Sequence, residues 1–166
     1  MRGAMKPILA FAFVVAAALP ARAQNPCAQL SQAQVLQQVN GVREQGALCG
    51  SRGGLAPAAA LVWNAQLEAV AREQALWMAD LGHLVHAGRE GQTLSQRAAV
   101  AGYDFARITE NLAHGQGGLS HALASWTASE SHCANLYDSR VTEMAMACVP
   151  GRGGRPFWVL VMGRPM

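Results

Sequence analysis

The sequence predicts one domain of mixed α and β structure, of the α+β class, with an antiparallel sheet. Apolar residues recur at a spacing of three or four between residues 31 and 101, which is typical of helices. The spacing changes to two over residues 108–113, as in a strand. Two more strand-like segments, 143–149 and 156–163, flank a glycine-rich turn. Helices followed by late strands predict helices packed on an antiparallel sheet.

The N-terminal segment predicts a signal peptide. Arg2 and Lys6 make the start basic, an apolar run follows over Ile8–Leu19, and the triplet Ala21-Arg22-Ala23 is a small-x-small cleavage site. The apolar run is too short for a transmembrane helix, which needs about 20 residues. We therefore expect cleavage after Ala23 and a secreted or periplasmic protein without a transmembrane segment.

Removal of residues 1–23 leaves a lead-in over residues 24–30 and one domain over residues 31–166. The chain has 13 Lys and Arg and 10 Asp and Glu. Because three basic residues leave with the signal peptide, the remaining charges balance at ten of each sign. A neutral chain has no basic footprint for nucleic acid, so we expect no nucleic-acid partner.

The first two predicted helices cover residues 32–45 and 64–81. Ser31, with Gln34 three positions later, has the pattern of a capping box that begins the first helix. The second helix has an apolar stripe that Gln74 interrupts. The stripe comprises Trp63, Leu67, Val70, Trp77 and Leu81.

The later elements follow in order. A loop with Gly88 and Gly91 leads to a short helix over residues 93–101, which Gly102 ends. The strand over residues 108–113 comes next. A fourth helix has apolar residues at i, i+3, i+4 and i+7, and the hairpin of residues 143–163 completes the domain. The helix positions are Leu119, Ala122, Leu123 and Trp126.

Glu110 is the most informative polar residue. It shares a strand face with Ile108 and Leu112, so we expect apolar surroundings. A buried carboxylate is costly unless it is paired, and a histidine or a metal ion is a candidate partner. Periodicity leaves the alternative equally open, that this face meets water and Glu110 is solvated.

The histidines and serines do not by themselves predict catalysis. His83 and His86 are three residues apart and would share a helix face, but Gly82 weakens a helix there. His114 and His121, like His83, fit ordinary surface or core positions. The chain has no Gly-x-Ser-x-Gly or His-Glu-x-x-His motif, so no residue is assigned as catalytic.

Four cysteines predict two disulfides. Cys27, Cys49, Cys133 and Cys148 form an even set in an exported chain, and no Cys-x-x-Cys spacing indicates a metal site. Four cysteines allow three pairings, and the spacing does not choose among them.

Five segments, in order, resemble the CAP superfamily of cysteine-rich secretory, antigen 5 and pathogenesis-related proteins, with an SCP-like domain of the bacterial secreted type. The match covers residues 32–163. The segments are Leu61-Val62-Trp63-Asn64 with the helix after it, Leu84-Val85-His86 with Glu90-Gly91 and Arg97, Thr109-Glu110-Asn111-Leu112-Ala113-His114-Gly115, Trp126 with Ser129, His132 and Asn135-Leu136, and Phe157-Trp158-Val159.

The resemblance implies a fold and a site. The fold is a three-layer α-β-α sandwich around a three-stranded antiparallel sheet. The site is a cleft lined by His86, Glu90, Glu110 and His132, in which His86 and His132 can bind a divalent ion such as zinc. The resemblance implies no nucleotide or organic cofactor.

The resemblance also bears on the disulfides. It favours pairing Cys49 with Cys133, which leaves Cys27 with Cys148. A local arrangement, Cys27 with Cys49 and Cys133 with Cys148, is the rival.

Three functions follow as expectations. The first is a monomeric binding module with a metal in the cleft and apolar surfaces for a lipid or protein ligand. The second is a hydrolase in which a histidine and a glutamate activate water, alone or on zinc. The third is a disulfide-stabilised scaffold for envelope or host protein contacts. The missing nucleophile favours a binding protein over an enzyme.

Overall fold

The central sheet has four strands, in the order β3-β5-β6-β4. The computed structural model describes residues 25–28 and 30–166, so the predicted signal peptide lies outside the described residues. Antiparallel pairing joins β6 to both β4 and β5, as predicted. The strands are β3 (Val62–Trp63), β4 (Phe105–His114), β5 (Glu143–Pro150) and β6 (Pro156–Pro165).

The prediction of three strands is wrong by one. β3 pairs in parallel with β5, through Val62 N–H donating to the Thr142 carbonyl at 3.2 Å and Asn64 N–H donating to the Met144 carbonyl at 3.0 Å. A strand of two residues has no periodicity that a sequence pattern can detect. A separate ribbon pairs β1 (Ala47–Leu48) with β2 (Gly54–Leu55).

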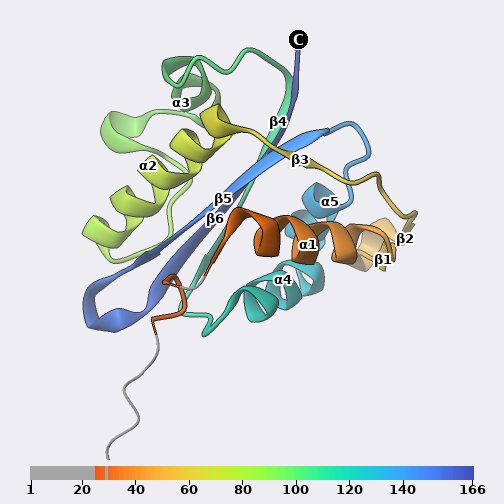
Figure 1. Ribbon diagram of the computed structural model, residues 1–166, viewed down its shortest axis with the longest axis horizontal. Helices are drawn as coiled ribbons and strands as arrows, with labels where there is room; N and C mark the ends of the chain where they lie inside the picture. Colours follow the sequence, from red (N-terminus) through yellow and green to blue (C-terminus); the bar gives the residue numbers. More distant parts are fainter. Residues whose placement is uncertain (1–24, 29) are drawn as a thin grey trace, which may run out of the picture.

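Helices cover both faces of the sheet, which confirms the α-β-α sandwich (Figure 1). One layer contains α2 and α3, and the other contains α1, α4 and α5. No helix among the described residues has both the length and the hydrophobicity needed to cross a bilayer. The helices are α1 (Gln32–Arg43), α2 (Ala65–Leu81), α3 (Leu94–Val100), α4 (Leu119–Ala128) and α5 (Glu130–Leu136).

The predicted helix ends rest on caps that the structure contains. Ser31 Oγ accepts from Gln34 N–H at 3.2 Å, and Gln34 Oε1 accepts from Ser31 N–H at 3.0 Å, which confirms the capping box. α2 ends at Gly82, whose φ of 79° is left-handed. Because the helix stops there, His83 and His86 do not share a helix face.

Successive side chains of β6 point alternately into the two hydrophobic cores, one on each face of the sheet. Trp158, Leu160 and Met162 belong to the core beneath α1, α4 and α5. Phe157, Val159 and Val161 belong to the core beneath α2 and α3. Each of these six side chains is at most 1% exposed, so β6 is buried on both faces and burial of apolar area stabilises both layers.

His132 follows the fourth helix, on a further helix that the sequence patterns do not predict. This fifth helix is α5. Ser129 ends α4 with an extended backbone (φ −101°, ψ 121°) and begins α5, so the chain changes direction between the two helices. The short α5 has too few apolar positions for its period to be separated from that of α4.

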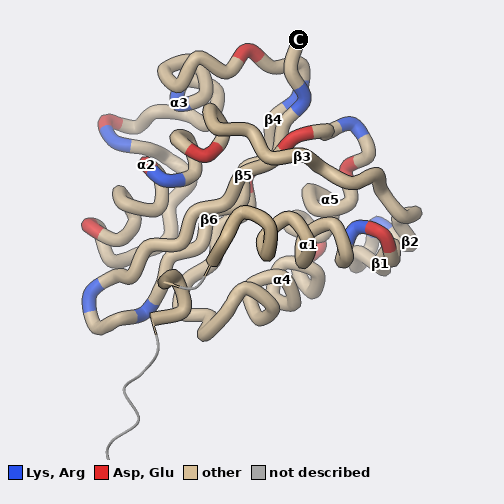
Figure 2. Tube along the Cα trace, in the orientation of Figure 1, with Lys and Arg blue, Asp and Glu red and all other residues tan. Residues whose placement is uncertain are grey.

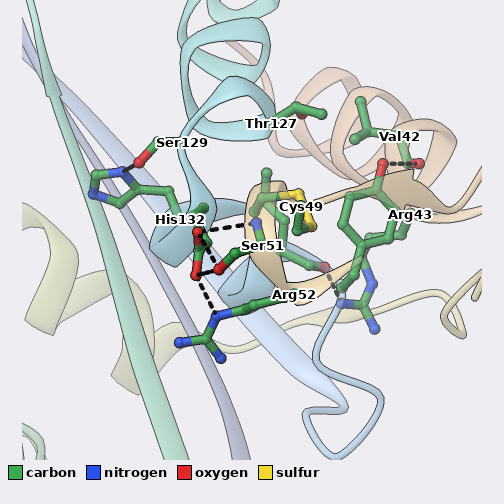
Figure 3. The surroundings of a disulfide bond; sticks show 12 residues. Val42, Arg43, Cys49, Ser51, Arg52, Thr127, Ser129 and His132 are labelled. Atoms are coloured by element: carbon green, nitrogen blue, oxygen red, sulfur yellow. Dashed lines mark hydrogen bonds and ion pairs between the residues drawn. A yellow bond between two sulfur atoms is a disulfide. The ribbon is translucent and has the colours of Figure 1, made fainter. Parts of the chain in front are cut away.

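The disulfides join Cys49 to Cys133 and Cys27 to Cys148, the pairing that the resemblance implied. The first links the segment after β1 to α5 and is fully buried. Figure 3 shows this disulfide next to Ser51 and Arg52, which contact the Glu130 carboxylate at the start of α5. The second ties the lead-in to β5.

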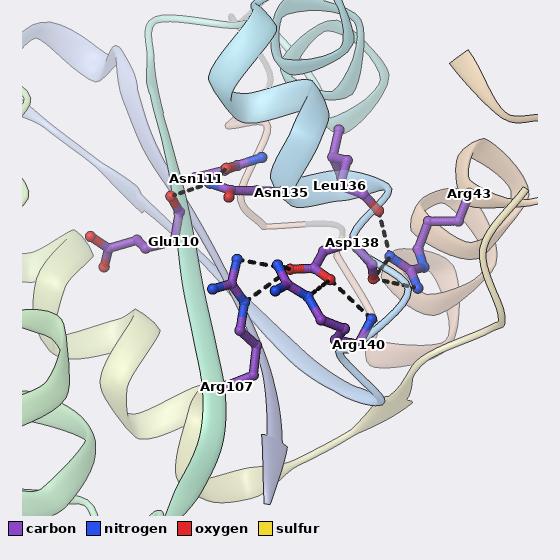
Figure 4. Close-up of polar contacts among 8 residues, drawn as sticks. All are labelled: Arg43, Arg107, Glu110, Asn111, Asn135, Leu136, Asp138 and Arg140. Carbon is purple, nitrogen blue, oxygen red and sulfur yellow. Dashed lines mark hydrogen bonds and ion pairs between the residues drawn. The ribbon is translucent and has the colours of Figure 1, made fainter. Parts of the chain in front are cut away.

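A buried aspartate holds the loop after α5 against the sheet (Figure 4). Arg140 donates to both Asp138 oxygens at 2.8 Å, and Arg107 on β4 donates from Nε to Oδ2 at 2.9 Å. Burial alone would raise the pKa of Asp138, but hydrogen bonds from Arg140 and the charges of Arg107 and Arg140 bring it down to about 2.

We expect Asp138→Asn to lower the free energy of unfolding at neutral pH by about 2 kcal/mol, because charged hydrogen bonds are lost. A carboxyl whose folded pKa is depressed stabilises the fold above its ordinary pKa and loses that contribution as the pH falls toward about 2. The difference between wild type and variant should therefore shrink in acid. Urea unfolding at several pH values measures it, with Asp104→Asn, an exposed aspartate, as the control. A constant difference down to the pKa of Asp138 would contradict this account.

Candidate functional site

The candidate site forms around β4, which is one of the two edge strands of the central sheet. Successive side chains of a strand point to opposite faces. Glu110 therefore faces the α2/α3 layer, and Asn111 faces α5, as Figure 4 shows. Because no strand among the described residues continues the sheet beyond β4, residues from both helical layers can meet around this edge.

Glu110 is buried and paired, so the alternative of a solvated glutamate is wrong. Its side chain is 2% exposed. Oε1 lies 2.8 Å from Nδ1 of His86, and Oε2 accepts from Nη2 of Arg97 at 2.8 Å. Both carboxylate oxygens are thus engaged by protein groups, which offsets part of the cost of burying the charge.

His86 presents the opposite edge of its ring to solvent. Its side chain is 64% exposed, although Nδ1 contacts the buried carboxylate. An ionised carboxylate only accepts hydrogen bonds, so Nδ1 carries the proton in this contact. The neutral ring then has its lone pair on Nε2, the atom that can bind a metal ion or accept a proton.

His132 approaches from α5 and is half-buried. Its Nδ1 lies 2.9 Å from Oγ of Ser129 (Figure 3). The His132 carbonyl accepts from Nδ2 of Asn111 at 3.0 Å, and Nδ2 of Asn135 donates to Oδ1 of Asn111 at 2.9 Å. This amide chain fixes α5 against β4.

His86 lies close enough to His132 to affect the pKa of His132. Burial lowers the pKa of His132, and the charge of the nearby His86 lowers it further. The structure thus places His86, Glu110 and His132 in one neighbourhood.

Glu90 is the fourth residue that the resemblance assigns to the cleft. It lies exposed in the 3₁₀ turn Arg89–Gly91 and adopts a positive φ of 57°. Within the part of the chain that the structure describes, its side chain makes no hydrogen bond or ion pair. Its neighbour Arg89 is instead held by Glu73 and Asp80 on α2.

A pocket of about 350 Å³ opens beside His86 and Glu110. It is bounded by the loop that follows His86 and by the start of α3. Its wall combines the two site residues with small, neutral and apolar groups. The lining residues are His86, Ala87, Gly91, Gln92, Thr93, Leu94 and Glu110.

The residues present fit an open metal site better than a closed one. No cluster of three or more His, Cys, Asp or Glu suited to a metal ion occurs among residues 25–28 and 30–166. Two imidazoles are available, and Glu110 supports one of them from behind in the carboxylate–histidine arrangement common around zinc. An ion held by His86 and His132 would keep coordination positions for water or a ligand.

Three polar residues near the site have roles that the sequence patterns do not predict. Gln74 is fully buried on α2 and donates to the loop that carries His86. Arg97 on α3 pairs with Glu110, and Ser129 orients His132. The available signals were a polar residue inside an apolar stripe for Gln74 and the i, i+3 spacing of Ser129 and His132.

Comparison with known proteins identifies the family. The model of the cysteine-rich secretory protein family, CAP, matches residues 36–162. No curated protein shows a significant sequence match to the chain.

Solved structures with the same fold include several bacterial surface or extracellular proteins. An outer surface protein of Borrelia burgdorferi has 19% identity and a TM-score of 0.65, over 82% of this chain and 97% of that one. An extracellular protein with an SCP domain from Bacillus anthracis has 21% identity and a TM-score of 0.63, over 80% of this chain and 41% of that one.

A cysteine-rich secretory protein of Staphylococcus aureus has 16% identity and a TM-score of 0.52, over 80% of this chain and 39% of that one. The chain therefore spans well under half of the Bacillus and Staphylococcus proteins. At these identities the likeness shows the fold alone.

We expect His132 to titrate below the ordinary histidine pKa of 6.5 in metal-free protein. His86→Gln should raise the pKa of His132 only part of the way back, because burial is the larger cause. Since the neutral form is favoured in the fold, the stability contributed by His132 is complete above pH 6.5 and falls as the pH drops through the folded pKa. NMR titration of the imidazole signals measures this, with His121→Gln on α4 as control. A His132 that titrates at or above 6.5 would refute it.

Proposed function

Because this chain belongs to the cysteine-rich secretory protein (CAP) family, we propose that it is an exported binding module whose His86 and His132 hold a divalent ion, such as zinc, in the cleft at the edge of β4. The N-terminal pattern and the two disulfides support export to an oxidising compartment. The ion would supply a Lewis-acid centre with positions for a ligand's oxygen or nitrogen atoms.

One observation carries this proposal, the 2.8 Å contact between Nδ1 of His86 and the buried carboxylate of Glu110. It selects the tautomer whose Nε2 is free and holds the ring in one orientation. A surface histidine without a metal or proton-transfer role does not require a buried carboxylate behind it. Ser129 gives His132 a corresponding contact at Nδ1.

The same geometry disfavours the hydrolase. A glutamate that activates water needs a carboxylate oxygen within reach of that water. Both oxygens of Glu110 are engaged, one by His86 and one by Arg97, and the side chain is 2% exposed. Glu110 is therefore suited to orient His86 and not to take a proton from a substrate.

We expect isothermal titration of the mature protein to show one zinc ion per chain. His86→Ala and His132→Ala should each abolish measurable binding, and Glu110→Gln should weaken it by about 10–100-fold, as is typical when a carboxylate behind a zinc-binding histidine is lost. Affinity should fall in acid, because the imidazoles must be neutral.

His121→Ala, an exposed histidine on α4, is the matched control and should bind zinc as the wild type does. Zinc binding that survives the double change of His86 and His132 would place the ion elsewhere. Absence of binding by the wild type would refute the metal site.

A groove in the layer formed by α1, α4 and α5 supports a second candidate function, binding of a long acyl chain. It measures about 990 Å³ and lies between α1 and α4, next to β1. None of its lining residues is charged, and α1 and α4 carry almost no charge in Figure 2. A lining without charge suits an extended hydrocarbon better than a polar ligand. The lining residues are Gln37, Gln38, Gly41, Val42, Gln45, Gly46, Ala47, Leu48, Ser120, Leu123, Ala124, Thr127, Ala128 and Tyr137.

We expect the protein to bind palmitate and Gly41→Trp to block it. A Cβ at Gly41 would meet no atom within 4 Å, and Gly41 lines the groove, so a larger side chain can extend from this position without a clash at its base. Competition with a fluorescent fatty acid measures binding. Ala69→Trp, on the exposed face of α2, adds the same ring in the opposite layer and should have no effect. Equal binding by wild type and Gly41→Trp would exclude the groove as the site.

A further inference from the structure

The segment that carries His86 has no regular secondary structure, and two side chains hold its backbone. It comprises residues 85–87, between α2 and the turn Arg89–Gly91. Gln74 donates from Nε2 to the carbonyls of Val85 and Ala87, the latter at 3.4 Å. Arg97 donates from Nη2 to the carbonyl between them, that of His86, at 3.2 Å. Three consecutive carbonyls are thus held by side chains from α2 and α3.

Arg97 contacts the same histidine by a second route. Its Nη2 also donates to Oε2 of Glu110 at 2.8 Å, and Oε1 of Glu110 contacts Nδ1 of the His86 ring at 2.8 Å. These hydrogen bonds form a ring of contacts: the His86 side chain contacts Glu110, Glu110 contacts Arg97, and Arg97 contacts the His86 carbonyl. Ring and backbone of His86 are therefore fixed by one guanidinium group.

The burial of the Arg97 and Gln74 side chains costs free energy of folding, which is unusual for contacts that only hold a loop. The Arg97 side chain is 3% exposed and Gln74 is fully buried. Nε and Nη1 of Arg97, and Oε1 of Gln74, have no hydrogen-bond partner among the described residues. Buried polar groups that are only partly satisfied destabilise a fold and are concentrated at functional sites.

The loop that follows His86 packs closely against the Arg97 side chain. A Cβ on Gly88 would lie 2.7 Å from Cδ of Arg97. Gly88 has a φ of −74°, which any residue can adopt, so it is the space taken by the arginine stem that requires glycine there.

We propose that Arg97 and Gln74 are positioning residues that together hold His86 in the place and tautomer in which Nε2 faces the cleft. We call these contacts of Arg97 and Gln74 with His86 the clamp. The role of Nε2 as a metal ligand rests on the proposed metal site, but the geometry of the clamp does not. Arg97 acts through Glu110 and the His86 carbonyl, and Gln74 acts through the carbonyls on either side.

The chain offers a matched control in a second arginine–carboxylate pair. Arg107 donates to the buried Asp138 at 2.9 Å and lies on β4, the strand that also carries Glu110. It does not contact His86 or Glu110. Loss of stability alone should therefore appear in Arg107→Met, whereas loss of His86 positioning should appear only in Arg97→Met.

The test uses two readouts on the mature protein. ¹⁵N NMR of metal-free protein, well above the ordinary imidazole pKa, reports which ring nitrogen of His86 carries the proton. Titration with zinc alone reports affinity. We expect a single Nδ1–H tautomer in wild type and in Arg107→Met, and a mixture in Arg97→Met with at least about tenfold weaker zinc binding. Gln74→Met should weaken zinc binding while Glu110 still selects the tautomer.

An unchanged tautomer and zinc affinity in Arg97→Met would overturn the proposal, and so would equal changes in Arg107→Met. If Arg97→Met does not fold, Arg97→Lys is judged by the same criteria, because lysine keeps the charge and loses the planar fork that reaches both acceptors. If wild type binds no zinc, the metal site is refuted, while the tautomer comparison still decides whether the clamp exists.

Discussion

The site depends on the burial of one carboxylate. Glu110 lies on a strand covered on both faces, and its charge is tolerated there because each oxygen has a partner. One partner is a cation that is itself buried, and the other is a histidine whose far edge reaches solvent. The buried carboxylate needs hydrogen-bond partners on both oxygens, and one of these partners is the exposed imidazole of His86. The interactions that stabilise the buried charge therefore also fix the orientation of the His86 ring at the surface.

The position of β4 explains why the two histidines can meet. A central strand would separate the helical layers completely, but β4 is at the edge of the sheet. The loop after α2 brings His86 to one side, and α5 brings His132 to the other. Hydrogen bonds from Asn111 and Asn135 hold α5 to this strand, and Trp126 on α4 donates to the Leu112 carbonyl at 2.9 Å. The edge of the sheet is thus the attachment for α4 and α5, and its Glu110 lines the pocket beside His86.

Two ionic clusters on β4 have different consequences because their surroundings differ. Around Asp138, two arginines that reach solvent satisfy one buried carboxylate and anchor a loop. Around Glu110, one of the two partners is a histidine, so the cluster ends in an atom with a free lone pair. The first arrangement is complete as a structural brace. The second leaves Nε2 of His86 able to interact with an ion or ligand, so the cluster around Glu110 is the one suited to a function.

The sequence alone determined the elements with strong local signals. These elements include the capping box at Ser31, the long helix that Gly82 ends and the β5–β6 hairpin. The sequence also indicated that Glu110, if buried, needs a partner. The ordered motifs determined the family. Only the tertiary structure decided that β3 joins the sheet in parallel, that α5 is separate from α4, and that Gln74 and Arg97 converge on His86. Capping and periodicity act between near neighbours, whereas these contacts join residues brought together by the packing of α2, α3 and β4, for which local patterns carry no distance information.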